Sequence, residues 1–281
     1  MQGLVLLSAS LVLSCFASPV VQKVEEAPAL KQNAASELAT FAYAVDLSAP
    51  VSISQFQCIR NNMYYTAFIR AYTPAGSGQI DTNACTNIQN ALAAAMGTEV
   101  YMTPQPNSVK SGAQQFDEMY NNLKNSNIAV RSVWIQVASP TNWYVTSSTN
   151  INFLNTILAR ATQFGVTVGI YTNSSEWKQI TGGARINNAM LWYWNTKGNG
   201  VVNESPANFN DFHSFGSWSK PLVKQFAQVE NICGIAVNRD IYSVSSAAVA
   251  DMSKSEKSDE ITVGGLGLEG AANLGKPEIG Q

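Results

Sequence analysis

Charged side chains are scarce in this 281-residue chain. Asp, Glu, Lys and Arg together make up 13% of it, and the formal net charge is −2. An average domain carries about a quarter charged residues. The chain therefore lacks the positive patch that nucleic acid or an anionic membrane surface requires. We expect neutral or weakly charged partners, and neither nucleic acid nor a membrane among them.

Patterns that bind metals or phosphates are also missing. The single histidine is His213, and no C-x-x-C pair is present, so a zinc site has no support. No glycine-rich loop follows the first predicted strand, which leaves a nucleotide site unsupported as well. His213 lies near Asp211, but without a G-x-S-x-G elbow a capped or packed loop histidine is far more expected than a catalytic triad. The sequence predicts neither a metal nor a cofactor.

Long apolar runs are absent apart from one at the N-terminus, at residues 4–17. This run is too short to span a bilayer. It ends in small residues, so we interpret residues 1–17 as a signal peptide cut after Ala17, although its start lacks the usual positive charge. A signal anchor is the less favoured alternative. The prediction is a secreted, extracellular protein.

The two flanks of the chain have little to bury. Residues 18–40 are rich in Pro, Ala, Glu and Lys, and residues 244–281 contain no aromatic side chain. Segments of such composition do not gain enough from burial to order themselves. We therefore predict a flexible linker over 18–40, a folded domain over 41–243 and a disordered tail over 244–281. The domain is expected to be a monomer.

Short β-rich segments alternate with helical patterns inside the domain. Predicted strands lie at 41–48, 66–72, 98–104, 132–138, 166–173, 189–195, 222–228 and 234–242. Predicted helices lie at 52–62, 84–96, 111–125 and 150–164, one after each of the first four strands, and the later connections are irregular. Alternation of this kind is typical of parallel strands joined by right-handed crossovers, so the fold class is α/β and eight strands predict a TIM-like (β/α) barrel. An open doubly wound sheet is the alternative.

The cysteines indicate one disulfide. With Cys15 in the signal peptide, three cysteines remain, an odd number that leaves one thiol free. Cys58 falls in the first predicted helix and Cys233 just before the last strand, and these elements become neighbours when a barrel closes. We predict a bridge between Cys58 and Cys233, with Cys85 free and buried in the second helix.

The functional end of a parallel barrel is the one where the strands end. Those ends are rich in amides and aromatic rings here. Along the first strand Ala42, Ala44 and Asp46 share one face, because side chains alternate along a strand. Small residues suit a crowded interior, which places Asp46 at the barrel mouth. A cap on the following turn is an equally weighted role for Asp46 at this point.

Five segments resemble a known family in their order and spacing. They are YAVDLS, VGIYTN, LWYWN, VKQF and GIAVNRDIY. Over roughly residues 41–243 the chain resembles the family 25 glycoside hydrolases, the Chalaropsis-type lysozymes, and in particular the lysozyme-like proteins of nematodes. The resemblance implies a barrel that cleaves the β-1,4 link after N-acetylmuramic acid in peptidoglycan, used in antibacterial innate defence.

The acids that the resemblance implies are only partly present. In the family the fourth strand ends in D-x-E, whose Glu is the general acid and whose Asp assists the acetamido group of the substrate. Asp46 matches the first-strand acid, but D-x-E falls on Gln136 and Ala138, and the last-strand Asp falls on Asn238. An amide does not release a proton near neutral pH, and a general acid contributes about 10²- to 10⁴-fold to the rate. Muramidase turnover is therefore doubtful, and a non-catalytic carbohydrate-binding or immune effector protein is the alternative.

Other acids are candidates for rebuilt chemistry. Asp240 lies two residues beyond Asn238 on the same strand face and is a possible substitute near the mouth. Glu176 and Glu204 lie in loops after strands, where solvated charges are the commoner outcome. Glu99 begins its strand and belongs at the closed bottom of the barrel.

Aromatic side chains near the strand ends offer flat faces for sugar rings. The predicted substrate-binding set is Tyr72, Tyr171, Trp177 and Trp194. Packing in the core is expected to account for about half of such rings. Trp134 lies one layer deeper than Gln136 and is assigned to the core.

Overall fold

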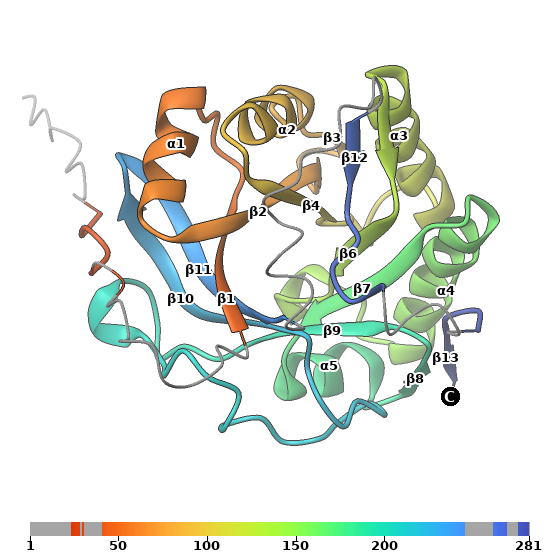
Figure 1. Cartoon of the computed structure of the whole chain (residues 1–281). Coiled ribbons are helices and arrows are strands. Elements are labelled where there is room, and N and C mark those ends of the chain that lie inside the picture. Colours follow the sequence, from red (N-terminus) through yellow and green to blue (C-terminus); the bar gives the residue numbers. More distant parts are fainter. Residues whose placement is uncertain (1–23, 29, 31–40, 245–260, 269–274, 281) are drawn as a thin grey trace, which may run out of the picture.

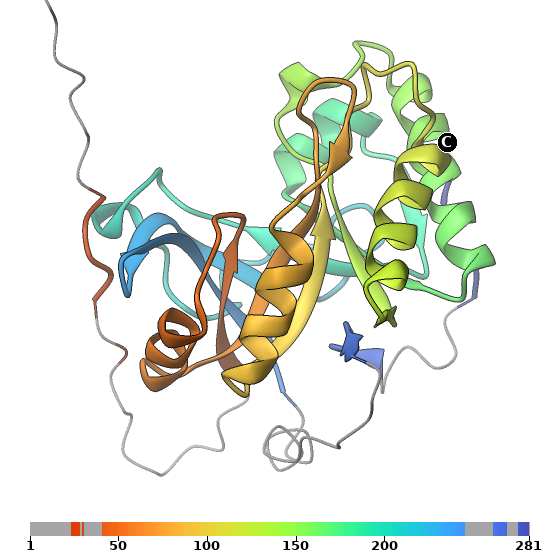
Figure 2. The same cartoon turned by 90° about the horizontal axis from the view of Figure 1, so that it is seen from above.

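The computed structural model describes residues 24–28, 30, 41–244, 261–268 and 275–280. The predicted signal peptide, residues 1–17, lies outside the described residues. Figure 1 shows a ring of strands with helices packed around part of it, and Figure 2 shows the same arrangement from above.

Eight strands form a closed barrel. They are β1 (Phe41–Leu47), β2 (Tyr64–Thr73), β4 (Gly97–Met102), β6 (Ser132–Gln136), β7 (Thr167–Thr172), β9 (Met190–Trp194), β10 (Val223–Ile232) and β11 (Ile235–Ser243). Their order is β1-β11-β10-β9-β7-β6-β4-β2, and pairing of β1 with β2 closes the ring. The predicted barrel is confirmed, and the open sheet is wrong because this closure leaves no gap between the first strand and the second.

The last strand runs in the opposite direction to its neighbours. β11 pairs antiparallel with both β1 and β10, whereas the other pairs of the ring are parallel. Only Cys233 and Gly234 connect β10 to β11, both with positive φ (56° and 78°). A two-residue turn makes a hairpin and cannot return the chain to the other end of the barrel. The prediction of eight parallel strands is therefore corrected for β11, whose beginning, and not its end, lies at the mouth.

Helices surround the barrel as the sequence pattern predicts. They are α1 (Ile53–Asn61), α2 (Ala84–Ala93), α3 (Gly112–Asn125), α4 (Ser147–Gln163) and a fifth, unpredicted helix, α5 (Ser174–Thr181). Ser52 and Ser111 cap α1 and α3 through capping boxes, which satisfy backbone donors that a helix start leaves free. No helix in the described ranges combines the length and apolar character that crossing a bilayer demands.

Five short segments complete the connections. β3 (Gln79–Ile80) pairs with β2, and β5 (Ile128–Val130) and β8 (Arg185–Asn187) lie outside the ring. The 3₁₀ turns η1 (Pro140–Asn142) and η2 (Val201–Asn203) follow β6 and β9.

Aromatic rings fill the barrel interior. The ring of Phe68 lies 4.5 Å from that of Trp192 and 5.9 Å from that of Trp134, measured between centroids. A Cβ atom at Gly169 would come within 2.2 Å of the Trp134 ring, so only glycine leaves room for this tryptophan. Trp134 is fully buried, as predicted. The rings make the barrel a packed core and not a pore.

The predicted disulfide is present. Cys58 of α1 and Cys233 of the β10–β11 turn are bonded, with their Cα atoms 6.0 Å apart. Cys85 is free, as predicted, but it is half-buried and not fully buried. The bridge ties the helix after the first strand to the hairpin that closes the barrel.

Parts of both flanks pack against the barrel. Glu25 and Ala27 exchange backbone hydrogen bonds with Asn231 at the end of β10. In the C-terminal flank, β12 (Ile261–Val263) pairs with β5, and β13 (Glu278–Gly280) pairs with β8. Val263 is fully buried. The predictions of a flexible linker and a disordered tail are thus corrected for these segments, because free strand edges of the domain accept their backbone groups.

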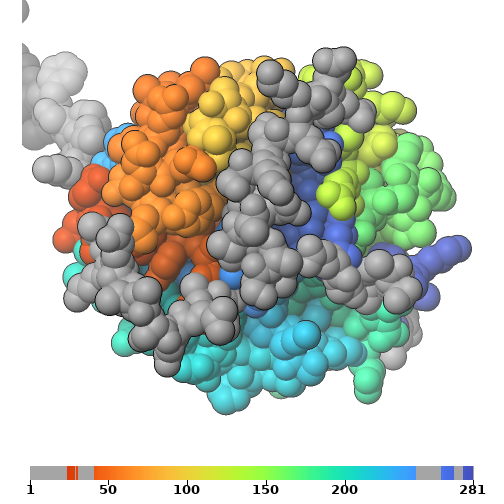
Figure 3. Space-filling model, viewed as in Figure 1, coloured from red at the N-terminus to blue at the C-terminus, as the bar shows by residue number. Residues whose placement is uncertain are grey.

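The segment 261–268 covers the bottom of the barrel. Figure 3 shows its dark-blue atoms beside the yellow-green part of the chain. The backbone N–H of Leu266 donates to Glu99 Oε1 at 2.9 Å, and that of Gly265 donates to Ser132 Oγ at 2.9 Å. Glu99 Oε2 also accepts from Trp134 Nε1 at 2.9 Å. Glu99 lies at the closed bottom, as predicted, and it accepts the hydrogen bond from Leu266 that holds this segment against the barrel.

Burial raises the pKa of Glu99 to about 7, against the hydrogen bonds from Leu266, Trp134 and Ser132. A carboxyl group with a raised pKa in the folded state stabilises the fold most below its unfolded pKa. That stabilisation is lost as the pH rises through about 7.

We therefore expect Glu99→Gln to flatten the pH dependence of the free energy of unfolding. Between pH 5 and pH 8 the wild-type loss should exceed that of the variant by about 2–3 kcal/mol. Urea unfolding at the two pH values measures this difference. Glu118→Gln is the matched control, because the hydrogen bonds from Lys110 and Tyr72 lower the pKa of Glu118, which is then ionised throughout this range. If Glu99→Gln kept the wild-type slope of the unfolding free energy against pH, the raised pKa of Glu99 would be contradicted.

Candidate functional site

Asp46 lies at the end of β1 and its carboxylate is held by two amides. Its Oδ1 accepts from Asn238 Nδ2 at 2.8 Å, and its Oδ2 accepts from Gln225 Nε2 at 2.6 Å. The side chain is 5% exposed. The alternative role as a turn cap does not hold, since Ser52 caps the following helix. Asp46 therefore faces the barrel interior at the mouth end, and β10 and β11 supply its partners.

Asp240 lies two ladder positions deeper in the barrel than Asn238. In the β1–β11 ladder Asp46 pairs with Asn238 and Ala44 pairs with Asp240. Asp240 is fully buried, and its Oδ1 accepts from Trp192 Nε1 at 2.8 Å. The prediction that Asp240 keeps a carboxylate near the mouth is corrected, because the reversed direction of β11 carries it down into the barrel.

Asp46 and Asp240 form a buried carboxyl pair. Burial, and then the charge of Asp46, raise the pKa of Asp240 well above its usual range. Burial raises the pKa of Asp46 to about 6, while hydrogen bonds from Asn238, Gln225 and Asp240 oppose the shift. Two such carboxyls titrate as a unit. Near neutral pH Asp240 keeps a proton and Asp46 carries the charge.

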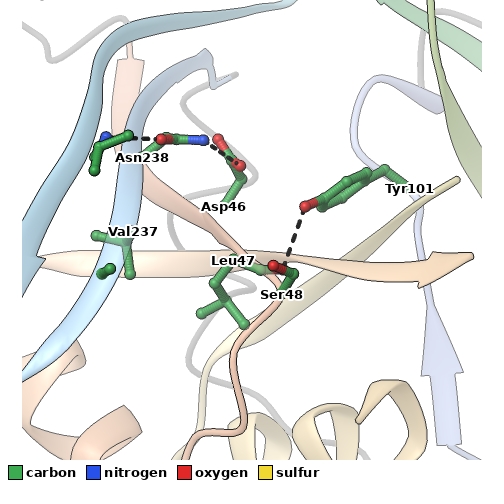
Figure 4. A pocket seen from close by; sticks show the side chains of 8 residues that line it. Asp46, Leu47, Ser48, Tyr101, Val237 and Asn238 are labelled. Atoms are coloured by element: carbon green, nitrogen blue, oxygen red, sulfur yellow. Dashed lines mark hydrogen bonds between the residues drawn. The ribbon is translucent and has the colours of Figure 1, made fainter. Parts of the chain in front are cut away.

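A small cavity of about 140 Å³ opens beside this pair. Its lining comes from the ends of β1, β4 and β10 and the start of β11, namely Asp46, Leu47, Ser48, Tyr101, Val229, Ala236, Val237 and Asn238. Figure 4 shows the side chains of Asp46 and Asn238 pointing toward each other, with Tyr101 across from them. The cavity gives Asp46 its access to the mouth.

The two positions that carry D-x-E in the resembled family hold no acid. Gln136 ends β6, and its Oε1 accepts from Thr103 Oγ1 at 2.5 Å. Ala138 follows in the loop, where its carbonyl accepts from Trp143 Nε1 at 2.9 Å. Both are half-buried at the mouth. Gln136 can bind a polar group of a ligand, and Ala138 offers only a methyl group.

Glu176 reaches into the place beside Ala138. It lies in the first turn of α5, and its Oε1 accepts from the backbone N–H of Ser139 at 2.8 Å. Its Oε2 accepts from Trp194 Nε1 at 2.8 Å. Burial raises the pKa of Glu176, and these two hydrogen bonds oppose the rise. A solvated loop charge was the commoner expectation for Glu176, yet it is a half-buried carboxyl at the mouth.

Tyr171 contributes its hydroxyl to the polar groups at the mouth. Its hydroxyl donates to Gln225 Oε1 at 2.9 Å, and Gln225 in turn binds Asp46. Burial raises the pKa of Tyr171 well above its usual range, and the charges of Asp46, Glu176 and Asp240 add to the rise. The Tyr171 hydroxyl thus belongs to the hydrogen-bonded group around Asp46.

Gln225 and Tyr101 were not assigned a role from the sequence. Gln225 is the third residue of VKQF, so the motif itself was the available signal. Tyr101 is 8% exposed and lines the cavity from β4. Its inward position could have been read from the alternation along that strand.

Two of the four predicted sugar-stacking rings are not available to a ligand. Tyr72 is fully buried, and its hydroxyl donates to Glu118 of α3 at 2.7 Å. Trp177 is 1% exposed and packs against Trp218, with ring centroids 5.1 Å apart. Tyr72 packs in the layer between barrel and helices because the register of β2 shifts between Arg70 and Tyr72, and Trp177 lies on the buried side of α5. The prediction is corrected for Tyr72 and Trp177.

The other two rings lie at the mouth. Trp194 ends β9 and is half-buried. Tyr171 is 5% exposed and packs edge-on against Trp192. Trp194 thus has ring surface open to a ligand, and Tyr171 contributes mainly its hydroxyl.

The remaining acidic candidates have structural partners. Glu204 pairs with Arg239 at 2.7 Å on the outside of the barrel. Asp211 accepts from Lys224, Tyr193 and Asn195, while His213 is exposed. Over the described ranges no cluster of His, Cys, Asp and Glu has the makings of a metal site. The geometry of the described residues therefore defines a β/α barrel with an acidic, amide-lined and aromatic site at its mouth.

Comparison with known proteins places this barrel in a family. The model of the family "Lysozyme-like protein 1" matches residues 37–226. Lysozyme-like protein 1 of Caenorhabditis elegans is 49% identical over 257 residues, which cover 87% of this chain and 84% of the relative. Lysozyme-like protein 7 of the same organism is 54% identical over 212 residues, 75% of each chain. The chain belongs to this lysozyme-like family.

More distant relatives carry the glycoside hydrolase name. A probable family 25 lysozyme of Dictyostelium discoideum is 34% identical over 200 residues, covering 70% of this chain and 89% of the relative. Among solved structures, a family GH25 lysozyme from Aspergillus fumigatus superposes with a TM-score of 0.57 at 13% identity, over 77% of this chain and all of that one. A muramidase from Trichobolus zukalii gives 0.55 at 17% identity, over 76% and 99%. The fold is that of these lysozymes.

We expect Asn238→Leu to raise the pKa of Asp46 above about 6. Leucine has the same branched shape as asparagine but cannot donate the hydrogen bond that favours the ionised carboxylate. Carboxyl-carbon NMR titration of Asp46 measures the change, and about one pKa unit is expected for a charge-assisted bond. Asn90→Leu is the control, because Asn90 donates to the carbonyl of Val51 and not to Asp46. An unchanged titration of Asp46 in Asn238→Leu would contradict the site geometry.

Proposed function

We propose that this protein binds the glycan strands of bacterial peptidoglycan, or a related N-acetyl sugar polymer, at the barrel mouth. The observation that carries the proposal is the grouping of open ring surface, amides and an ionised carboxylate at that one end. Trp194 offers the ring, Gln136 and Asn238 offer amides, and Asp46 carries the charge. Flat apolar faces and fixed polar groups are what a sugar ring with acetamido and hydroxyl substituents requires.

The relatives support this ligand class. The named relatives are lysozymes or lysozyme-like proteins, and the neighbouring solved structures include muramidases. Fold alone does not assign function, so the proposal depends on the side chains at the mouth. Those side chains are suited to hydrogen bonding and stacking.

In this proposal the acids of the family's D-x-E motif are missing from their usual positions. Gln136 and Ala138 replace the D-x-E acids, and neither can protonate a leaving sugar. Binding needs hydrogen bonds and rings, whereas cleavage needs a proton donor. The protein is therefore first a glycan-binding protein of the lysozyme type.

A secreted protein with an antibacterial role fits the ligand. The apolar run at residues 4–17 is the feature that supports secretion. The disulfide between Cys58 and Cys233 is of the kind that persists in oxidising compartments. A secreted protein encounters peptidoglycan outside the cell, and we propose a role in defence against bacteria.

We expect Trp194→Ala to weaken binding to soluble peptidoglycan fragments by about 5- to 100-fold, because it removes the open ring face at the mouth. A stacking contact of this kind contributes on the order of 1–3 kcal/mol. Isothermal titration calorimetry with purified muropeptide oligomers measures the affinity.

The matched control for this variant is Tyr65→Ala. Tyr65 is 40% exposed near the start of β2 and therefore at the opposite end of the barrel. Its removal should leave the affinity unchanged. Equal losses in the two variants, or no binding by the wild-type protein, would contradict the proposed function.

A further inference from the structure

The mouth contains one carboxyl group whose position the family's usual motif does not explain. Glu176 comes from α5, but both its oxygens are directed at the ends of other elements. One accepts from the backbone of Ser139, the residue after Ala138, and the other from the indole of Trp194 at the end of β9. The carboxyl group is thereby fixed beside the methyl group of Ala138.

The surroundings hold Glu176 in one orientation. Asn173 caps α5 by accepting from the backbone N–H of Glu176 at 2.8 Å, which fixes the start of the helix. Ser139 adopts a left-handed backbone with φ of 56°, a conformation that costs free energy for a residue with a Cβ. The hydrogen bond from Ser139 to Glu176 helps to hold this turn. Such fixed carboxyls and locally strained turns are common at functional sites.

Glu176 also has the electrostatic relation to the other acids that acid–base chemistry requires. Burial raises its pKa, while the Asp46–Asp240 pair carries one negative charge near neutral pH. Glu176 and Asp46 lie at the same end of the barrel, because their partners are at the mouth ends of strands, whereas Asp240 lies deeper. Two carboxyl sites in different environments can divide the roles of acid and base between them.

We propose that Glu176 is a catalytic residue that donates a proton to the glycosidic oxygen of a bound N-acetyl sugar polymer, in the place that Ala138 leaves without an acid. This inference rests on the proposed function, since it requires the glycan to bind at the same mouth. The inference adds slow hydrolysis of the bound glycan to the proposed binding.

The step consumes one water molecule. The Glu176 carboxyl gives its proton to the glycosidic oxygen as the bond from that oxygen to the anomeric carbon breaks, and the electron pair stays on the oxygen. Water forms the new bond to the anomeric carbon and loses a proton to the Asp46 carboxylate. Solvent then returns a proton to Glu176 and takes one from Asp46, so the protein is unchanged after each turnover.

The test uses the intact protein and purified peptidoglycan. New reducing ends measure cleavage, and calorimetry with muropeptide oligomers measures binding, on the same preparations. Glu176→Gln should lower turnover by at least about 10²-fold, the low end of what a general acid contributes, and should leave binding within about threefold. Adding Ala138→Glu to that variant should restore at least about a tenth of the wild-type rate, because it puts a proton donor back at the same place.

Glu118→Gln is the matched control. Glu118 also accepts two hydrogen bonds, from Tyr72 and Lys110, but it faces the helix layer. Its turnover should equal that of the wild-type protein.

A further variant separates proton donation from a purely structural role. Trp194→Phe keeps a ring but removes the N–H that binds Glu176 Oε2. Loss of a donor to the ionised form raises the pKa of Glu176. Because turnover needs the protonated form, the fall in rate at high pH should shift to higher pH. If Glu176→Gln does not fold, this shift still decides the proposal.

Each remaining outcome has one meaning. Binding by the wild-type protein without any cleavage would overturn the role of Glu176 and leave the proposed function standing. Full turnover in Glu176→Gln, or an unshifted pH profile in Trp194→Phe, would also overturn the role of Glu176. Absence of binding to peptidoglycan would overturn both the proposed function and this inference.

Discussion

The register between β1 and β11 is the constraint on which the site depends. It places Asn238 opposite Asp46 and Asp240 opposite Ala44. Because the β10–β11 hairpin reverses the last strand, two residues along β11 lead down into the barrel and away from the mouth. An amide therefore faces Asp46 at the mouth, and the second carboxyl is enclosed below it with Trp192. A shift of one residue would turn both side chains out of the barrel.

This arrangement leaves the charged carboxylate of Asp46 at the mouth and removes the second carboxyl, Asp240, from it. Asp46 remains the charged member of the pair, since Asp240 is buried and holds its proton. Gln225 and Tyr171 form one hydrogen-bonded group with Asp46, and Trp194 forms a second with Glu176. The mouth thus carries two polar groups on a rigid aromatic core. Preorganised groups of this kind suit recognition of a neutral, hydroxyl-rich polymer.

The alternation of strand and helix patterns was sufficient to predict the barrel, and small residues on one face of β1 indicated the mouth for Asp46 but left a turn cap equally open. The disulfide followed from the same closure, because Cys58 and Cys233 lie in elements that a closed barrel makes neighbours. The direction of β11 was missed, although the short link at Cys233 and Gly234 carried the signal. Glu176 could not be placed, since its role comes from Ser139 and Trp194, which are distant in sequence. Residues 261–268 were misjudged because composition does not reveal a groove that accepts a backbone.

The most direct test of a glycan site at the mouth is an NMR titration of the indole N–H signals with soluble muropeptide oligomers. The chain has six tryptophans, and only Trp194 binds Glu176 through its indole at the mouth. We predict that the Trp194 signal shifts most and saturates with the binding curve, while the signals of the buried Trp134 and Trp177 move little. A saturating titration in which the Trp194 signal stays in place would contradict the account.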